Sequence, residues 1–147
     1  MKSRSVRQVM DTETHAIHAH EPVLRAVRHL VRAGITGAPV VDDSGSCVGM
    51  ITERECLALL TGLAGGDIPQ GTVGQHMVRV EPVGPETDVF FVAGMMRGQG
   101  VRRVPVVGGG RLLGVVTRKD ILRALDHMWD LPIYATTPPA PVRGKNT

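Results

Sequence analysis

The sequence resembles itself at a nearly fixed offset, and this internal repeat limits the possible folds more than any other feature. Residues 34–41 (GITGAPVV) align with residues 100–107 (GVRRVPVV) at an offset of 66. Residues 48–52 (VGMIT) align with residues 113–117 (LGVVT) at an offset of 65. An offset that changes by one residue between blocks is typical of a duplicated unit with small loop changes. The chain is therefore expected to fold as two copies of one unit.

The first copy has the pattern of a helix, a hairpin and a second helix. Its first helix has apolar residues at helical spacing and basic residues on the opposite face. The expected buried stripe is Val23, Ala26, Val27, Leu30 and Val31. Residues 38–41 and 47–51 are apolar runs, and the segment 42–45 (DDSG) between them has turn chemistry, which predicts a hairpin. A second helix is expected over residues 52–60.

The second copy repeats this order, with a helix over residues 88–99, strands near 104–107 and 112–116, and a helix over 118–128. A β-α-β-β-α unit of this size cannot bury both faces of its sheet alone, so the two copies are expected to pack together. The predicted class is α/β (α+β). The expected boundaries are 1–61 for the first repeat, 62–71 for a glycine-rich linker, 72–128 for the second repeat and 129–147 for a proline-containing flexible tail.

Composition and charge narrow the class of protein. Aromatic residues make up only 3% of the chain, so the core must be built from Val, Leu, Ile, Ala and Met. The formal charge is +3, but the basic residues are scattered, so nucleic acid is not expected as the main ligand. Cys47 and Cys56 lack C-x-x-C spacing, which favours reduced thiols. With no apolar run of membrane length and no signal-like start, we expect a cytoplasmic protein without a membrane partner.

A further pair of segments completes a family pattern. V-x-x-V-M at residues 6–10 corresponds to V-G-Q-H-M at residues 73–77, upstream of the repeated blocks. These features, found twice in one order, resemble the CBS domain over about residues 6–61 and 72–126. The resemblance implies a CBS domain pair (Bateman module) about a pseudo-twofold axis. It also implies clefts between the repeats for an adenosine-containing regulatory ligand such as AMP, ADP, ATP, S-adenosylmethionine or NAD, with no required cofactor.

The family places a Ser or Thr at the end of the last strand and an Asp three positions later, where they hold phosphate and ribose. The second copy has this pattern in Thr117 and Asp120, with Arg118 and Lys119 adding positive charge. The first copy has Thr52 followed by Glu55, which is one methylene longer. The same residues form a helix-capping box, and one side chain can serve both roles. The resemblance therefore favours the second copy as the ligand site.

The loops before the hairpins are expected to supply backbone groups to the base, as they do in the family, and Ile35 and Val101 to pack on an adenine face. The residues assigned to this part of the site are Gly34, Ile35, Thr36, Ala38, Pro39, Val101, Arg102, Arg103 and Pro105.

Other motifs receive a structural interpretation. His15, His18 and His20 have no acidic or Cys ligand at metal spacing in the sequence, so we expect surface histidines and no metal site. The glycines at 108–110 lie between two expected strands and lack the G-K-[ST] ending of a phosphate loop, which predicts a hairpin turn. The sequence offers no nucleophile and base pair, so no catalytic residue and no enzyme activity are expected.

Three functions remain open at this point. The first is a stand-alone regulatory module that senses an adenine nucleotide, and so cellular energy state, and passes its occupancy to a protein partner. The second is an assembly module without a ligand. The third is a nucleic-acid-binding protein that uses Arg102, Arg103, Arg111, Arg118 and Lys119.

A homodimer is also expected, because the helix over residues 88–99 is apolar on more than one side. Its core stripe would be Val89, Val92, Ala93 and Met96, whereas Phe90, Phe91 and Met95 lie elsewhere around the helix, and Gly94 and Gly98 would allow close approach of another helix.

Overall fold

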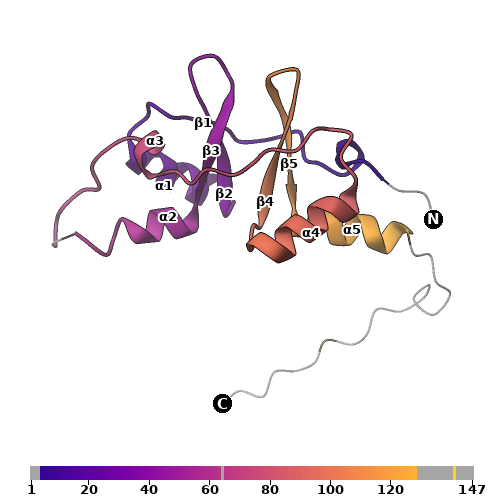
Figure 1. The fold of residues 1–147 in the computed structure, drawn as a ribbon. Coiled ribbons are helices and arrows are strands. Elements are labelled where there is room, and N and C mark those ends of the chain that lie inside the picture. The colour runs from indigo at the N-terminus through magenta and orange to yellow at the C-terminus, as the bar shows by residue number, and fades with distance from the viewer. Residues whose placement is uncertain (1–3, 64, 129–140, 142–147) are drawn as a thin grey trace.

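The computed structural model describes residues 4–63, 65–128 and 141, and it shows a mixed α/β fold of two repeats that lie side by side (Figure 1). The elements of the first repeat are β1 (Ile17–His18), α1 (Val23–Ala33), β2 (Gly37–Val41), β3 (Cys47–Thr52) and α2 (Glu53–Ala58). Those of the second are α4 (Val89–Gln99), β4 (Arg103–Gly108), β5 (Arg111–Thr117) and α5 (Arg118–Met128). Two short helices, η1 (Val6–Gln8) and α3 (Val73–His76), precede the repeats.

The hairpins form where the apolar runs predicted them. In the first repeat β2 pairs antiparallel with β3 and parallel with β1, in the order β1-β2-β3. In the second, β4 pairs antiparallel with β5, and Val83 makes a parallel bridge to Val106 in the place that β1 takes in the first. Gly109 and Gly110 have φ of 60° and 74°, which suits a tight turn between β4 and β5. The expectation of a hairpin turn there is confirmed.

Capping residues mark the ends of the long helices. Asp88 caps α4, since its side chain accepts a hydrogen bond from the Phe90 N–H at 2.7 Å. Gly34 and Gly100 end α1 and α4 in the left-handed conformation. The expected core stripe of α4 is confirmed: Val89, Val92 and Met96 are buried, and Ala93 is half-buried.

One expected core residue of α1 is exposed. The helix buries Val23, Ala26 and Leu30, and Val27 is half-buried, but Val31 is 74% exposed. Each residue turns the helix by about 100°, so Val31 points well away from its buried neighbour Leu30. The prediction that Val31 belongs to the buried stripe was wrong.

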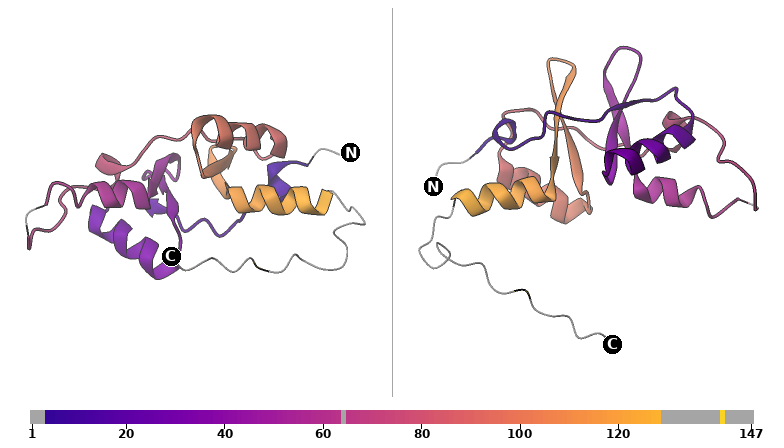
Figure 2. Two further views of the ribbon diagram at one scale, coloured as in Figure 1. Left: turned by 90° about the horizontal axis from the view of Figure 1, so that it is seen from below. Right: turned by 180° about the vertical axis from the view of Figure 1, so that it is seen from behind.

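The hydrophobic core of each repeat includes residues from a short helix that belongs, in sequence order, to the other repeat. Val6 of η1 is fully buried in the core of the second repeat, and the N-terminal segment lies beside that repeat (Figure 2). Val73 of α3 is fully buried in the core of the first repeat. The expected boundaries at 1–61 and 72–128 separate the two copies of the sequence pattern. In the folded chain the two short helices are exchanged, because each packs in the core of the other copy.

Two equivalent glycines make this exchange possible. A Cβ at Gly49 would lie 2.7 Å from the Val78 carbonyl oxygen, and one at Gly114 would lie 2.8 Å from the Asp11 carbonyl oxygen. The strand residues next to these glycines exchange backbone hydrogen bonds with the crossing segments, Met50 with Val78 and Val115 with Asp11. The repeated V/L-G pattern therefore reflects a close backbone approach.

The tail expected over 129–147 lies outside the described residues, apart from residue 141. No helix within 4–63 or 65–128 is long and apolar enough to cross a membrane.

Candidate functional site

Hairpin register brings the two predicted halves of each site together. Gly37 pairs with Thr52 in the first repeat, and Arg103 pairs with Thr117 in the second. The first turn of each following helix is also tied to the loop, because Glu53 N–H donates to the Thr36 carbonyl at 2.9 Å and Arg118 N–H donates to the Arg102 carbonyl at 3.3 Å. In each repeat the loop before the hairpin thus lies against the start of the last helix.

The second-repeat pair forms a reciprocal cap. Both the N–H and the hydroxyl of Thr117 donate to Oδ2 of Asp120 at 2.9 Å, and the Asp120 N–H donates to the Thr117 hydroxyl at 3.2 Å. The Asp120 side chain is 13% exposed, and its Oδ1 lies 4.0 Å from an Arg123 guanidinium nitrogen. Asp120 therefore caps the helix through Oδ2, and its Oδ1 takes no part in the cap.

The first-repeat pair has the same arrangement in spite of the longer acid. The Thr52 N–H donates to Oε2 of Glu55 at 2.8 Å, and the Thr52 hydroxyl donates to the same oxygen. Both residues are half-buried, like their counterparts in the second repeat. The extra methylene therefore does not prevent the cap.

A side chain of the second repeat crosses to the first at this end of the hairpins. The Arg103 guanidinium donates to the Thr36 hydroxyl from Nε at 3.1 Å and from Nη2 at 2.9 Å. Burial lowers the pKa of Arg103, while the nearby Asp120, Glu53 and Asp11 oppose that shift. The boundary therefore holds a half-buried cation among carboxylates of both repeats.

The remaining predicted residues differ in accessibility. Ala38, Pro39 and Pro105 are buried, so their side chains shape the strands from within the protein. Ile35 and Val101 are half-buried, each packed against the core of its own repeat. The exposed ones are Gly34, Thr36, Arg102, Arg118 and Lys119.

Two hollows have linings that include few or none of the predicted site residues. One, of about 420 Å³, lies where α2 meets the linker, and Glu55 is the predicted residue in its lining. The other, of about 680 Å³, lies over α1 and is lined by His18 and by Arg25, Arg28 and Arg32. From the sequence these arginines were expected only on the outer face of α1, with no role in a site, although their i, i+3, i+7 spacing puts them along one side.

The cysteines have the properties of unreactive thiols. Burial raises the pKa of Cys47, and burial together with Glu55 and Glu53 raises that of Cys56, so both are protonated at neutral pH.

A family model and a related protein both match most of this chain. The family model described as CBS domain matches residues 6–62 and 73–127. The protein MJ1225 of Methanocaldococcus jannaschii is 28% identical over 125 residues, which cover 84% of this chain but only 44% of that protein.

Two solved structures share the fold. One is CBSX2 in complex with AMP, with a TM-score of 0.73, 29% identity, and coverage of 84% of this chain and 97% of that one. The other is the CBS domain pair of MJ0100 in complex with 5-methylthioadenosine and S-adenosyl-L-methionine, with a TM-score of 0.75, 25% identity, and coverage of 87% and 100%.

Proposed function

Because this chain belongs to the CBS domain family, we propose that it is a regulatory module that binds an adenine nucleotide of the AMP, ADP or ATP type at the boundary between its repeats. The observation that carries the proposal is the convergence of the two loops, the two Thr-x-x-acid pairs and Arg103 at one end of the hairpins. Structural neighbours that hold AMP or S-adenosyl-L-methionine support this ligand class.

The residues suit the parts of a nucleotide. The Asp120 carboxylate accepts hydrogen bonds from ribose hydroxyls, and its Oδ1 lies outside the cap with Thr117. Arg118 and Lys119 are exposed next to the cap and attract phosphate. The backbone of the loops at 34–36 and 101–103 would contact the base, with Ile35 and Val101 against its faces.

The second-repeat acid is proposed as the main ribose ligand. Asp120 keeps the shorter side chain of the family pattern, whereas Glu55 reaches its cap with an additional methylene. Nucleotide occupancy would alter the contacts at the boundary, among them the Arg103 to Thr36 hydrogen bonds. A change in the relative arrangement of the repeats is the proposed signal to a protein partner, in a reducing cytoplasm that the two free thiols suit.

We also propose that the module is a homodimer. Phe91 on α4 is 63% exposed and Leu122 on α5 is 66% exposed, and these two helices contact each other. Gly94 and Gly98 face open space, where another helix could approach closely. The same apolar surface favours the second candidate function, an assembly module that has no ligand.

A thermal-shift panel tests the nucleotide proposal. The full chain is melted with AMP, ADP, ATP, NAD and S-adenosylmethionine, since a ligand that binds only the native state stabilises it by about 2.7 kcal/mol at 100 times its Kd. An increase in Tm with at least one adenine nucleotide is expected. An unchanged Tm across the panel would favour the assembly module, and salt-sensitive binding of RNA or DNA would favour the nucleic-acid alternative.

A further inference from the structure

Two histidines and an aspartate that are apart in the sequence meet at the turn end of the first hairpin. His18 ends β1, which pairs with β2 at Ile17 to Val40 and at His18 to Val41. The Ala19 N–H then donates to the Val41 carbonyl at 2.9 Å, so the chain leaves the sheet beside the turn that follows β2. This turn contains Asp43.

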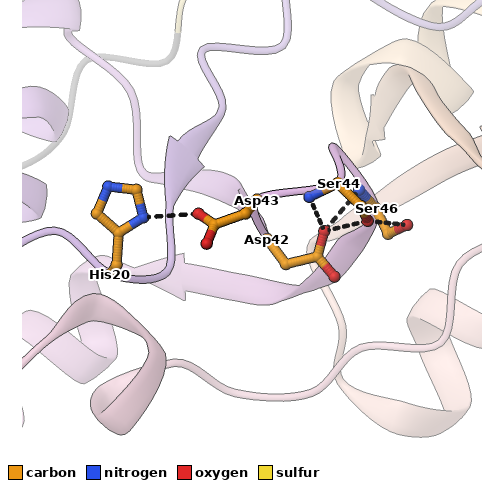
Figure 3. Close-up of polar contacts among 5 residues, drawn as sticks. All are labelled: His20, Asp42, Asp43, Ser44 and Ser46. Atoms are coloured by element: carbon orange, nitrogen blue, oxygen red, sulfur yellow. Dashed lines mark hydrogen bonds and ion pairs between the residues drawn. The ribbon is translucent and has the colours of Figure 1, made fainter.

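The side chains approach to distances that a metal ion can span. His20 Nδ1 lies 3.1 Å from Asp43 Oδ1 (Figure 3), and the rings of His18 and His20 have centroids 5.2 Å apart. One nitrogen or oxygen from each of the three residues lies within 4.8 Å of the others. Around tetrahedral zinc, with bonds of about 2.0–2.1 Å, ligand atoms are separated by about 3.3 Å. The His20 to Asp43 pair is already near that separation, and small rotations of exposed side chains would bring His18 to it.

Hydrogen bonds to the Asp42 side chain stabilise the turn that carries Asp43. One carboxylate oxygen of Asp42 accepts hydrogen bonds from Ser44 N–H at 2.9 Å, from the Ser44 hydroxyl at 2.6 Å and from Ser46 N–H at 3.0 Å. Asp42 and Asp43 thus have different roles, one within the turn and one toward His20, as Figure 3 shows. A ligand on a fixed turn loses less conformational freedom when it binds an ion.

His15 does not join this group. Its carbonyl oxygen lies 2.6 Å from His29 Nε2, and its ring lies 3.6 Å from a Glu13 carboxylate oxygen. Asp43 is not apparent as a neighbour of these histidines in the sequence, because 23 residues separate it from His20. The parallel pairing of β1 with β2 was the feature needed to place them together.

We propose that His18, His20 and Asp43 bind one divalent transition-metal ion of the Zn²⁺ class, with water completing the coordination. Two imidazoles and one carboxylate are ligands that this class accepts, whereas Mg²⁺ and Ca²⁺ prefer oxygen alone. The site lies at the opposite end of β2 from Gly37 and the nucleotide residues, roughly 13 Å along the strand, and is separate from the proposed nucleotide function.

The ion would attach the segment before α1 to the β2–β3 turn. β1 contributes only two paired residues to the sheet, and α1 begins three residues after His20. A metal bridge between His20 and Asp43 would therefore hold both β1 and the start of α1 against the hairpin. It would slow local opening of this edge of the first repeat.

Metal titration of the tag-free, metal-free full chain tests the site. Calorimetry with Zn²⁺ is expected to show one saturable site per chain, and His20→Ala and Asp43→Asn are each expected to weaken it at least about tenfold. His127→Ala, which changes an exposed histidine on α5, is the matched control and should leave the affinity unchanged. All three substitutions are on exposed side chains, and melting of the metal-free variants checks that they fold.

Two further measurements distinguish zinc binding at this site from zinc binding by other side chains. The Co²⁺ derivative is expected to absorb in the visible without a thiolate charge-transfer band, and Zn²⁺ should slow hydrogen exchange of the Ala19 N–H. The proposal is overturned by a thiolate band, which would assign the ion to Cys47 or Cys56. It is equally overturned if Zn²⁺ does not bind saturably, or if His20→Ala binds it as the unchanged chain does.

Discussion

Arg103 of the second repeat donates two hydrogen bonds to the Thr36 hydroxyl of the first, at 3.1 Å and 2.9 Å, and so joins the repeats beside their capped helices. Position 103 corresponds to Gly37 in the duplicated pattern. A Cβ at Gly37 would lie 3.2 Å from the Arg103 Cδ, so the glycine leaves space for the arginine stem. The contact is asymmetric: an arginine on one side of the repeat boundary occupies space that a glycine on the other side leaves.

Arg103→Ala is expected to lower the free energy of unfolding by about 1 kcal/mol, because it removes hydrogen bonds from a half-buried charged group. Urea denaturation measures the change. Arg102→Ala is the control, since Arg102 is exposed, and a cost below about 0.5 kcal/mol is expected there. Equal costs for the two variants would mean that the crossing contact contributes nothing to stability.

Asp120→Ala is expected to remove most of the affinity for adenine nucleotides, because the proposed ribose ligand is lost. Loss of the cap to Thr117 should cost about 1 kcal/mol of stability, so the fold persists. Calorimetry with AMP and ATP measures the affinity, and Glu55→Ala is the matched variant in the first repeat. If Asp120→Ala binds as the unchanged chain does and Glu55→Ala does not, the main site is in the first repeat.

Phe91→Glu is expected to convert the proposed dimer to a monomer, because it would bury a carboxylate in an apolar contact between α4 helices. Light scattering at micromolar concentration reports the mass. Val31→Glu, at a residue 74% exposed on α1, should leave the mass unchanged. A monomer mass for the unchanged chain contradicts the dimer, and a Phe91→Glu chain that stays dimeric excludes α4 as its interface.

Gly114→Ala is expected to destabilise the fold by about 2 kcal/mol, since the new Cβ would lie 2.7 Å from Met10 Sδ and 2.8 Å from the Asp11 carbonyl oxygen. Gly49→Ala should have a similar effect at the equivalent position. Gly65→Ala is the control, because a Cβ there meets nothing within 4 Å. Thermal or urea unfolding measures all three. A neutral Gly114→Ala would show that the N-terminal segment can move away from β5 without cost.

The sequence by itself determined the local elements and the two halves of the candidate site. Short apolar runs on either side of turn residues marked both hairpins, and the Thr-x-x-acid pairs marked the starts of α2 and α5. These features depend on hydrogen bonds and turn preferences within a few residues, which a single sequence displays directly. Position in the repeat then indicated which residues meet at the end of each hairpin.

Only the tertiary structure decided which segments complete each core and which side chains meet across the chain. The burial of Val6 in the second repeat, the exposure of Val31, the reach of Arg103 to Thr36 and the approach of Asp43 to His20 depend on how distant segments pack. The hydrophobic effect is non-directional and depends only on the apolar area removed from water. The sequence therefore indicates that an apolar residue is buried, but not in which of the two cores it is buried. The burial of Val6 and the reach of Arg103 depend on packing between the two repeats, whereas the approach of Asp43 to His20 depends on the pairing of β1 with β2 inside the first repeat.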